Sequence, residues 1–295
     1  MKVCIAGLGL IGGSIAKRLQ AQGVTVIGFD RDAETVAAAR AAGIHAELTA
    51  AESMQAACDI IVLALPVLAI LPALEALQAS DADLIIDVAS TKRSVLAAAE
   101  ASGIAPRFVG CHPLAGSHEA GFAAARGDLF EGAPVFLCAA PSTGGRALSE
   151  ARHFWRSLGA RVEMVDAEEH DHELALTSHL PQTLATALAN ALRSAAIPRQ
   201  RLGPGGRDMT RLAASSPHVW SDILLTNADN LQQPIADVIA ALQEIGVALA
   251  ANDRERLLSV FAAAQAWTQA APPTGVADRG AARVNYQPAT PHLIW

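Results

Sequence analysis

The stretch VCIAGLGLIGGS, residues 3–14, constrains the fold of this chain more than any other. It sets Gly7, Gly9 and Gly12 in the order G-x-G-x-x-G, after an apolar run and at the start of a helical pattern that includes Leu10 and Ile11. In a strand–turn–helix unit the first glycine allows the tight turn, the second lets a pyrophosphate approach, and the third lets helix pack on strand. Because the helix N-terminus then faces the phosphates, this stretch is predicted to bind a dinucleotide.

The next predicted strand ends in IGFD, which places Asp30 18 residues after Gly12. A carboxylate at this distance accepts hydrogen bonds from ribose hydroxyls, so Asp30 favours NAD as the cofactor. Arg31 follows directly and is able to hold a 2′-phosphate, which keeps NADP open as a second cofactor. A tight turn without a ligand is the alternative interpretation of the glycines.

Short apolar runs alternate with helical patterns through the first half of the chain, which predicts βαβ units and a largely parallel sheet. The predicted strands cover residues 3–6, 24–29, 60–65, 84–88, 108–111, 135–138 and 161–165. Long helical patterns follow, over residues 167–197, 217–250 and 253–270. We therefore expect an α/β Rossmann-type domain over residues 1–165 and an all-helical domain over residues 166–295, with an irregular tail from about residue 271.

The composition excludes several classes of function. The chain is 52% hydrophobic with a net charge of −7 and has no basic cluster, which argues against a nucleic-acid surface. The apolar run IIVLALPVLAILPAL is interrupted by two prolines and is too short to span a bilayer. The four cysteines of the chain form no CxxC motif and are typical of a protein in a reducing compartment. We expect a cytoplasmic protein that acts on a small molecule.

Three polar residues stand where an α/β sheet places its ligands or where a helix is interrupted. Ser90 and His112 each follow a predicted strand, and Pro113 holds His112 in an extended conformation. His179 stands two residues before Pro181, which removes a backbone donor and bends the helix. A kink in the first long helix of the second domain suits a wall of the cleft between the domains. An imidazole titrates near physiological pH and is suited to general base catalysis. Each residue also has a structural alternative: a helix N-cap for Ser90, and satisfied structural histidines for the other two.

The glycine-rich stretch GPGGRDMTR offers two cations. Arg207 and Arg211 are four residues apart and are able to share a helix face, and an arginine fork binds a carboxylate in bidentate fashion. Ion pairing with Asp208 is the structural alternative. His170 and His172 have no further metal ligands nearby, so we interpret them as a solvated helix start and predict no metal site.

Taken together, these motifs resemble the prephenate/arogenate dehydrogenase family of tyrosine biosynthesis. The resemblance covers roughly residues 1–250 in family order, and its motifs are GLGLIGGS, DVASTKR, GCHPLAGSHEAG, LFEGAPVFL, HDHELALTSHLPQ and GGRDMTRLAASSPHVWSDI. It implies a Rossmann domain with a helical dimerisation domain, hence a homodimer. Two positions depart from the family pattern: His118 stands where glutamate is common, and GPGGRDMTR lacks an aromatic residue found in many members.

The resemblance implies roles for matching positions. His112 is similar to the catalytic histidine that bonds to the substrate's ring hydroxyl, and Ser90 to the residue that supports it. His179 is similar to a second active-site histidine and Arg211 to the arginine that holds a substrate carboxylate. Ser117 matches a small hydroxyl position, and Trp220 an aromatic that reaches the site from the partner subunit.

Gln182, one helical turn past His179, is the residue we expect to separate prephenate from arogenate, which differ by a keto group against an ammonium. A neutral amide tolerates either group.

Two other classes of protein remain as alternatives. Reductases and β-hydroxyacid dehydrogenases with a Rossmann and a helical domain commonly use a lysine on the interdomain helix, and residues 174–196 contain none. A non-catalytic NAD-binding sensor would not need His112, His179 and Arg211 together.

Overall fold

A computed structural model describes residues 1–49, 57–115 and 121–270. Within these residues one sheet contains eight strands in the order β3-β2-β1-β4-β5-β6-β7-β8. They are β1 (Lys2–Ala6), β2 (Thr25–Asp30), β3 (His45–Leu48), β4 (Ile60–Leu63), β5 (Leu84–Asp87), β6 (Phe108–Pro113), β7 (Pro134–Cys138) and β8 (Arg161–Met164). Only β6 and β7 pair antiparallel. The predicted α/β class is confirmed; the mostly exposed β3 escaped prediction because it has little apolar signal.

Helices cover both faces of the sheet. Because strand side chains alternate, Val3 and Ile5 of β1 join one buried cluster while Cys4 and Ala6 join the other. The first cluster packs under α1 (Leu10–Ala21), α2 (Ala33–Ala41) and α5 (Gly145–Ser157), and the second under α3 (Val67–Ala76) and α4 (Arg93–Ala101). Short helical turns η2 (Leu77–Ala79), η3 (Ala105–Arg107) and η4 (Phe122–Ala124) complete this half.

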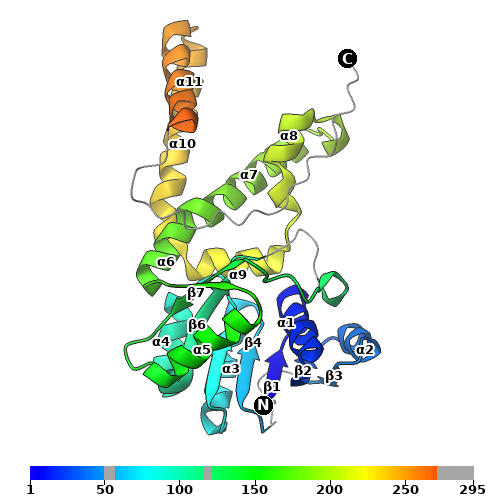
Figure 1. The fold of residues 1–295 in the computed structure, drawn as a ribbon. Helices are drawn as coiled ribbons and strands as arrows, with labels where there is room; N and C mark the ends of the chain where they lie inside the picture. Colours follow the sequence, from blue (N-terminus) through cyan, green and yellow to red (C-terminus); the bar gives the residue numbers. More distant parts are fainter. Residues whose placement is uncertain (50–56, 116–120, 271–295) are drawn as a thin grey trace.

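The remaining helices stand together at one side of the sheet, and α10 and α11 project away from it (Figure 1). They are α6 (Ala167–Leu174), η5 (Ala175–His179), α7 (Leu180–Ser194), η6 (Arg199–Arg201), α8 (Pro204–Met209), η7 (Arg211–Ala214), α9 (Pro217–Thr226), α10 (Ala228–Ala250) and α11 (Arg254–Gln269). Asp166 caps α6 by accepting from the amides of Glu168 and Glu169, as a helix start requires. The predicted tail from residue 271 lies outside the described residues.

Two of the long predicted helices are interrupted, and the interruptions matter for the site. The run over residues 167–197 contains a π-helical turn, η5, directly before Pro181 in the first turn of α7. The run over residues 217–250 is not one helix: it breaks at Asn227, whose φ of −129° separates α9 from α10. A π-helical turn such as η5 commonly marks a functional site, because it changes the direction in which the following side chains point.

The turn between β1 and α1 shows why glycine is needed there. Gly7 has a φ of +89°, and a Cβ on Gly12 would lie 1.9 Å from the Gly7 carbonyl oxygen. Gly9, in contrast, has no heavy atom within 4 Å of where its Cβ would be. Gly7 and Gly12 therefore serve close packing, whereas Gly9 leaves open space in front of the helix N-terminus.

Gly12→Ala is expected to lower the free energy of unfolding by about 1–3 kcal/mol, because the backbone must move to admit the methyl group. Chemical denaturation followed by circular dichroism measures the change. Gly9→Ala is the matched control and should stay within about 0.5 kcal/mol of the parent chain. Equal loss in both variants would contradict the packing role of Gly12.

Candidate functional site

A buried ion pair fixes the end of β6. Lys92 and Asp87 are both fully buried, and the Lys92 ammonium donates to the Asp87 carboxylate and to the Cys111 carbonyl at 2.8 Å. The other carboxylate oxygen of Asp87 accepts from the Cys111 amide at 3.0 Å. Since Cys111 precedes His112, these bonds hold the backbone of the predicted histidine at the ligand side of the sheet.

His112 is buried and meets a second histidine. Its Nδ1 lies 2.9 Å from Nε2 of His170, and Nδ1 of His170 lies 2.8 Å from a carboxylate oxygen of Asp171. The prediction that His170 belongs to a solvated helix start is therefore wrong: its side chain has no exposed surface, whereas His172 is exposed. His170 stands four residues before Leu174, so both face the protein interior. That spacing was the signal in the sequence.

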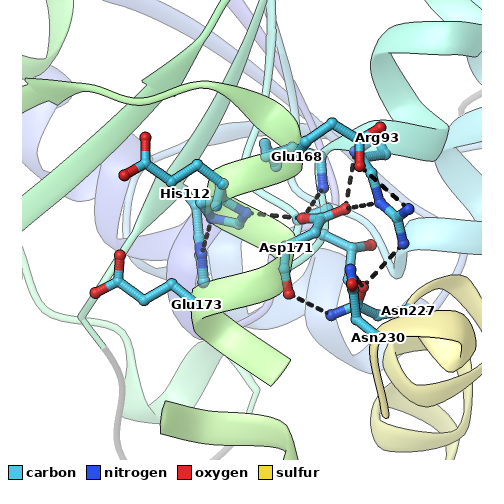
Figure 2. Close-up of polar contacts among 12 residues, drawn as sticks. Arg93, His112, Glu168, Asp171, Glu173, Asn227 and Asn230 are labelled. Atoms are coloured by element: carbon cyan, nitrogen blue, oxygen red, sulfur yellow. Dashed lines mark hydrogen bonds and ion pairs between the residues drawn. The ribbon is translucent and has the colours of Figure 1, made fainter. Parts of the chain in front are cut away.

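Asp171 links α6 to the start of α4. Its carboxylate accepts from the amides of Lys92 and Arg93, at 2.8 and 3.0 Å, and from Nε of Arg93 at 3.3 Å. In Figure 2 it lies between His112 on one side and Arg93 and Asn227 on the other. The α4 N-terminus is therefore capped by a residue far away in sequence, and Ser90 is not that cap.

Asn227 joins His179 to this network. Its Oδ1 accepts from Arg93 and Asn230, and its Nδ2 donates to the Asp171 carbonyl and lies 3.1 Å from Nδ1 of His179. His179 therefore accepts at Nδ1 and carries its proton on Nε2, a buried atom with no partner among the described residues. Asn227 has no helix-period or motif signal, and sequence reasoning missed it. An orphaned buried donor of this kind indicates a ligand.

Gln182 presents the opposite polarity one turn further along. Its Nε2 donates to the Leu212 carbonyl at 2.8 Å, while its buried Oε1 has no partner within the part of the chain that the structure describes. Trp220 lies edge-on to His179 with 6.0 Å between ring centroids. The structure thus brings Trp220 to His179 within one chain, without a partner subunit.

The remaining predicted residues lie around this cluster or outside the description. Ser90 is half-buried between β5 and α4, and Arg207 and Arg211 are exposed. The two arginines do not share one helix face, because α8 ends at Met209 and Arg211 begins η7. Ser117 and His118 lie outside the described residues. Within the described ranges, no group of three or more His, Cys, Asp or Glu side chains is arranged to hold a metal ion.

Burial keeps the two predicted histidines neutral. Burial lowers the pKa of His112 well below its usual value, and the nearby His170, Lys92 and His179 lower it further. Burial likewise lowers the pKa of His179 to about 4, although Asp171 acts in the opposite direction. At neutral pH each ring therefore has one unprotonated nitrogen and a single N–H proton, and in His179 the unprotonated Nδ1 faces Asn227.

The glycine loop and Asp30 fit a dinucleotide. Asp30 accepts from the amides of Leu8 and Asp32, at 2.8 and 2.9 Å, which holds its carboxylate beside the loop. The helix that begins at Leu10 has no side-chain cap at Gly9, so its N-terminal amides are available to phosphate oxygens. Ile11 is half-buried in its first turn, and Arg31 is exposed next to Asp30.

Comparison with protein families matches two consecutive domains. Residues 15–164 match the prephenate dehydrogenase nucleotide-binding domain, and residues 166–263 match the prephenate dehydrogenase dimerization domain. Among curated proteins, the cyclohexadienyl dehydrogenase of Zymomonas mobilis is 35% identical, over 89% of this chain and 93% of that protein. The prephenate dehydrogenase of Bacillus subtilis is 33% identical, over 92% of this chain and 76% of that protein.

The fold agrees with a solved relative. The prephenate dehydrogenase of Aquifex aeolicus, in a complex with hydroxyphenyl propionate and NAD⁺, superposes with a TM-score of 0.80 at 28% identity. The match covers 91% of this chain and 97% of that one. From the two matched domains, the extent of the curated relatives and this shared fold, we conclude that the chain belongs to the prephenate dehydrogenase family.

Proposed function

We propose that this chain oxidises prephenate with NAD and releases carbon dioxide, giving 4-hydroxyphenylpyruvate for tyrosine biosynthesis. The observation that carries the proposal is His112: a buried, neutral imidazole at the ligand edge of the sheet, in a chain of this family. NAD is held by the Gly7–Gly12 loop and by Asp30, and it supplies the acceptor for the hydride. NADP stays a second candidate because Arg31 adjoins Asp30.

Prephenate is a cyclohexadiene with a ring hydroxyl, a ring carboxylate and a pyruvyl side chain. His112 accepts the hydroxyl proton, and the electron density left on oxygen helps expel hydride from the same carbon. Loss of carbon dioxide from the opposite ring carbon then makes the ring aromatic. Ser90 supports the hydroxyl, and the Nε2–H of His179 and the guanidinium of Arg211 are donors for carboxylate oxygens.

The other predicted contacts complete the substrate site in this proposal. Trp220 packs against His179 at the edge of the site, and Arg207 adds positive charge to that of Arg211. Ser117, five residues after His112 in the sequence, contributes a hydroxyl.

His112→Asn is expected to lower kcat by about 10²–10⁴-fold, because the general base is removed, and to leave the Kd for NAD unchanged. Stopped-flow absorbance of reduced nicotinamide and a fluorescence titration measure the two quantities. His153→Asn, on the exposed face of α5, is the matched control. An unchanged kcat in His112→Asn would remove His112 from this role.

The pH dependence of the parent enzyme tests the same assignment. Burial lowers the pKa of His112, and protonation removes the base, so kcat/KM should fall only when the pH drops well below 6.5.

Arogenate carries an ammonium where prephenate has a keto group. In this proposal the Gln182 side chain contacts that group of the substrate. Since Nε2 of Gln182 is engaged by the Leu212 carbonyl, the group left for a ligand is the Oε1 acceptor. An acceptor pairs with an ammonium and gains nothing from a keto oxygen. We therefore infer that arogenate is a second substrate, with the keto substrate tolerated.

Gln182→Met is expected to lower kcat/KM for arogenate about 10-fold or more, since a hydrogen bond to a charged group is lost, and to change kcat/KM for prephenate little. Steady-state rates with both acids, each with NAD, measure the ratio. Gln233→Met is the control, because Gln233 is exposed on α10 and bonds to Asp237. An equal change for both acids would contradict the role of Gln182.

The helical half points to a homodimer. Helices α10 and α11 expose a series of large apolar side chains: Ile239, Leu242, Val247, Leu249, Leu258, Phe261 and Trp267. By length and composition α10 also passes as a membrane-spanning helix. We favour a second copy as its cover, because residues 166–263 match a dimerization domain. None of the four cysteines forms a disulfide, which fits a reducing compartment, so we place the dimer in the cytoplasm.

Analytical ultracentrifugation should give a dimer for the parent chain and a larger monomer fraction for Leu242→Lys, because a charge would be buried in the interface. Leu48→Lys on β3 is the control: Leu48 is 58% exposed and Leu242 62%. A monomeric parent chain at micromolar concentration would refute the dimer.

A further inference from the structure

Two buried groups beside His112 have no part in the function proposed above. His170 and Asp171 are both fully buried, on α6, and they continue the contact from His112 in a single line of hydrogen bonds. Phe136 packs edge-on against His170, with 5.7 Å between ring centroids, and holds the ring from a second side. The His170 side chain therefore has both of its nitrogens engaged and its plane fixed.

With His170 neutral, the chain of bonds has one consistent assignment of protons. Burial by itself would raise the pKa of Asp171, but bonds from His170 and from the amides of Arg93 and Lys92 lower it below its usual value. An ionised Asp171 can only accept, so Nδ1 of His170 donates to it. A neutral His170 then has its lone pair on Nε2, which makes Nδ1 of His112 the donor.

We propose that His170 and Asp171 are positioning residues that hold His112 in the tautomer with its lone pair on Nε2. Ser-His-Asp sites use a carboxylate for the same purpose, whereas here a second imidazole stands between carboxylate and base. This inference rests on the proposed function, in which Nε2 of His112 receives the hydroxyl proton. When His112 becomes cationic, its bond to His170 becomes charge-assisted, and Asp171 stabilises the positive charge without taking a proton.

His170 is the better residue to substitute. Asp171 also caps α4 and binds Arg93, so a change there would disturb the fold as well as the line of bonds. His170→Phe keeps a planar ring against Phe136 and removes the acceptor. His170→Gln restores an amide oxygen near the former Nε2 position.

In His170→Phe the Nδ1–H of His112 loses its partner, and a buried N–H without a partner is disfavoured by roughly 10- to 100-fold in population. We expect kcat with prephenate and NAD to fall by roughly that factor, while KM and the Kd for NAD stay within about twofold. His170→Gln should recover part of the loss. In a His112→Asn background, His170→Phe should have no further effect on kcat, because both act through the same base.

The tautomer is measured independently of turnover. In protein labelled with ¹⁵N-histidine at neutral pH, the His112 resonances, assigned by their loss in His112→Asn, should show a protonated Nδ1 and an unprotonated Nε2. His170→Phe should shift this population toward the other tautomer. Thermal unfolding shows whether each variant is folded; if His170→Phe is not, His170→Gln and the parent spectrum still decide.

The outcomes separate the two proposals. A parent spectrum with the proton on Nε2 of His112, or an unchanged kcat in folded His170→Phe, overturns the positioning role and leaves the proposed function standing. Loss of kcat in His170→Phe that persists in the His112→Asn background also overturns it, since the effect would not pass through His112. No turnover by the parent chain with either acid refutes the function, whereas the tautomer measurement still tests the line of bonds.

Discussion

The carboxylate of Asp171 is the group on which the site depends. It is fully buried, yet it accepts from the amides of Lys92 and Arg93, from the Arg93 guanidinium and from His170. Each bond repays part of the cost of taking a charge out of water, and removing any partner would expose that cost. Because the donors come from α4 and from α6 itself, the carboxylate fixes the first helix of the second half against the sheet.

The Asp87–Lys92 pair provides the complementary constraint from within the sheet. It joins the end of β5, the start of α4 and the Cys111 backbone in β6. Lys92 connects the two carboxylates directly, because its ammonium donates to Asp87 and its backbone amide donates to Asp171. Two buried contacts therefore position His112: the bonds of the Cys111 backbone in β6, and the bond of its own ring to His170 on α6.

The helical half contains buried polar atoms that have no hydrogen-bond partner among the described residues and are therefore available to a ligand. Nε2 of His179 and Oε1 of Gln182 have no partner among the described residues, and the two atoms are of opposite polarity. His179 ends the π-helical turn, and Gln182 lies one turn further on. Asn227 orients the first and the Leu212 carbonyl orients the second. The tautomer of His179 and the amide orientation of Gln182 follow from these bonds to other elements, so the groups that η5 and α7 present depend on their neighbours.

The sequence by itself determined the Rossmann half, because its signals are local: glycines required by a turn, apolar runs of strand length, and an acid at a set distance. His112 was found for the same reason, since a proline and a strand end mark it. The bonds of His170, Asp171 and Asn227 were decided only by the tertiary structure. Their partners lie up to 134 residues away, for Asn227 and Arg93, and 58 residues away for His170 and His112. Such distances leave no periodic pattern in the sequence, and the bonds of the Asn227 side chain to Asp171 and His179 are visible only in the fold.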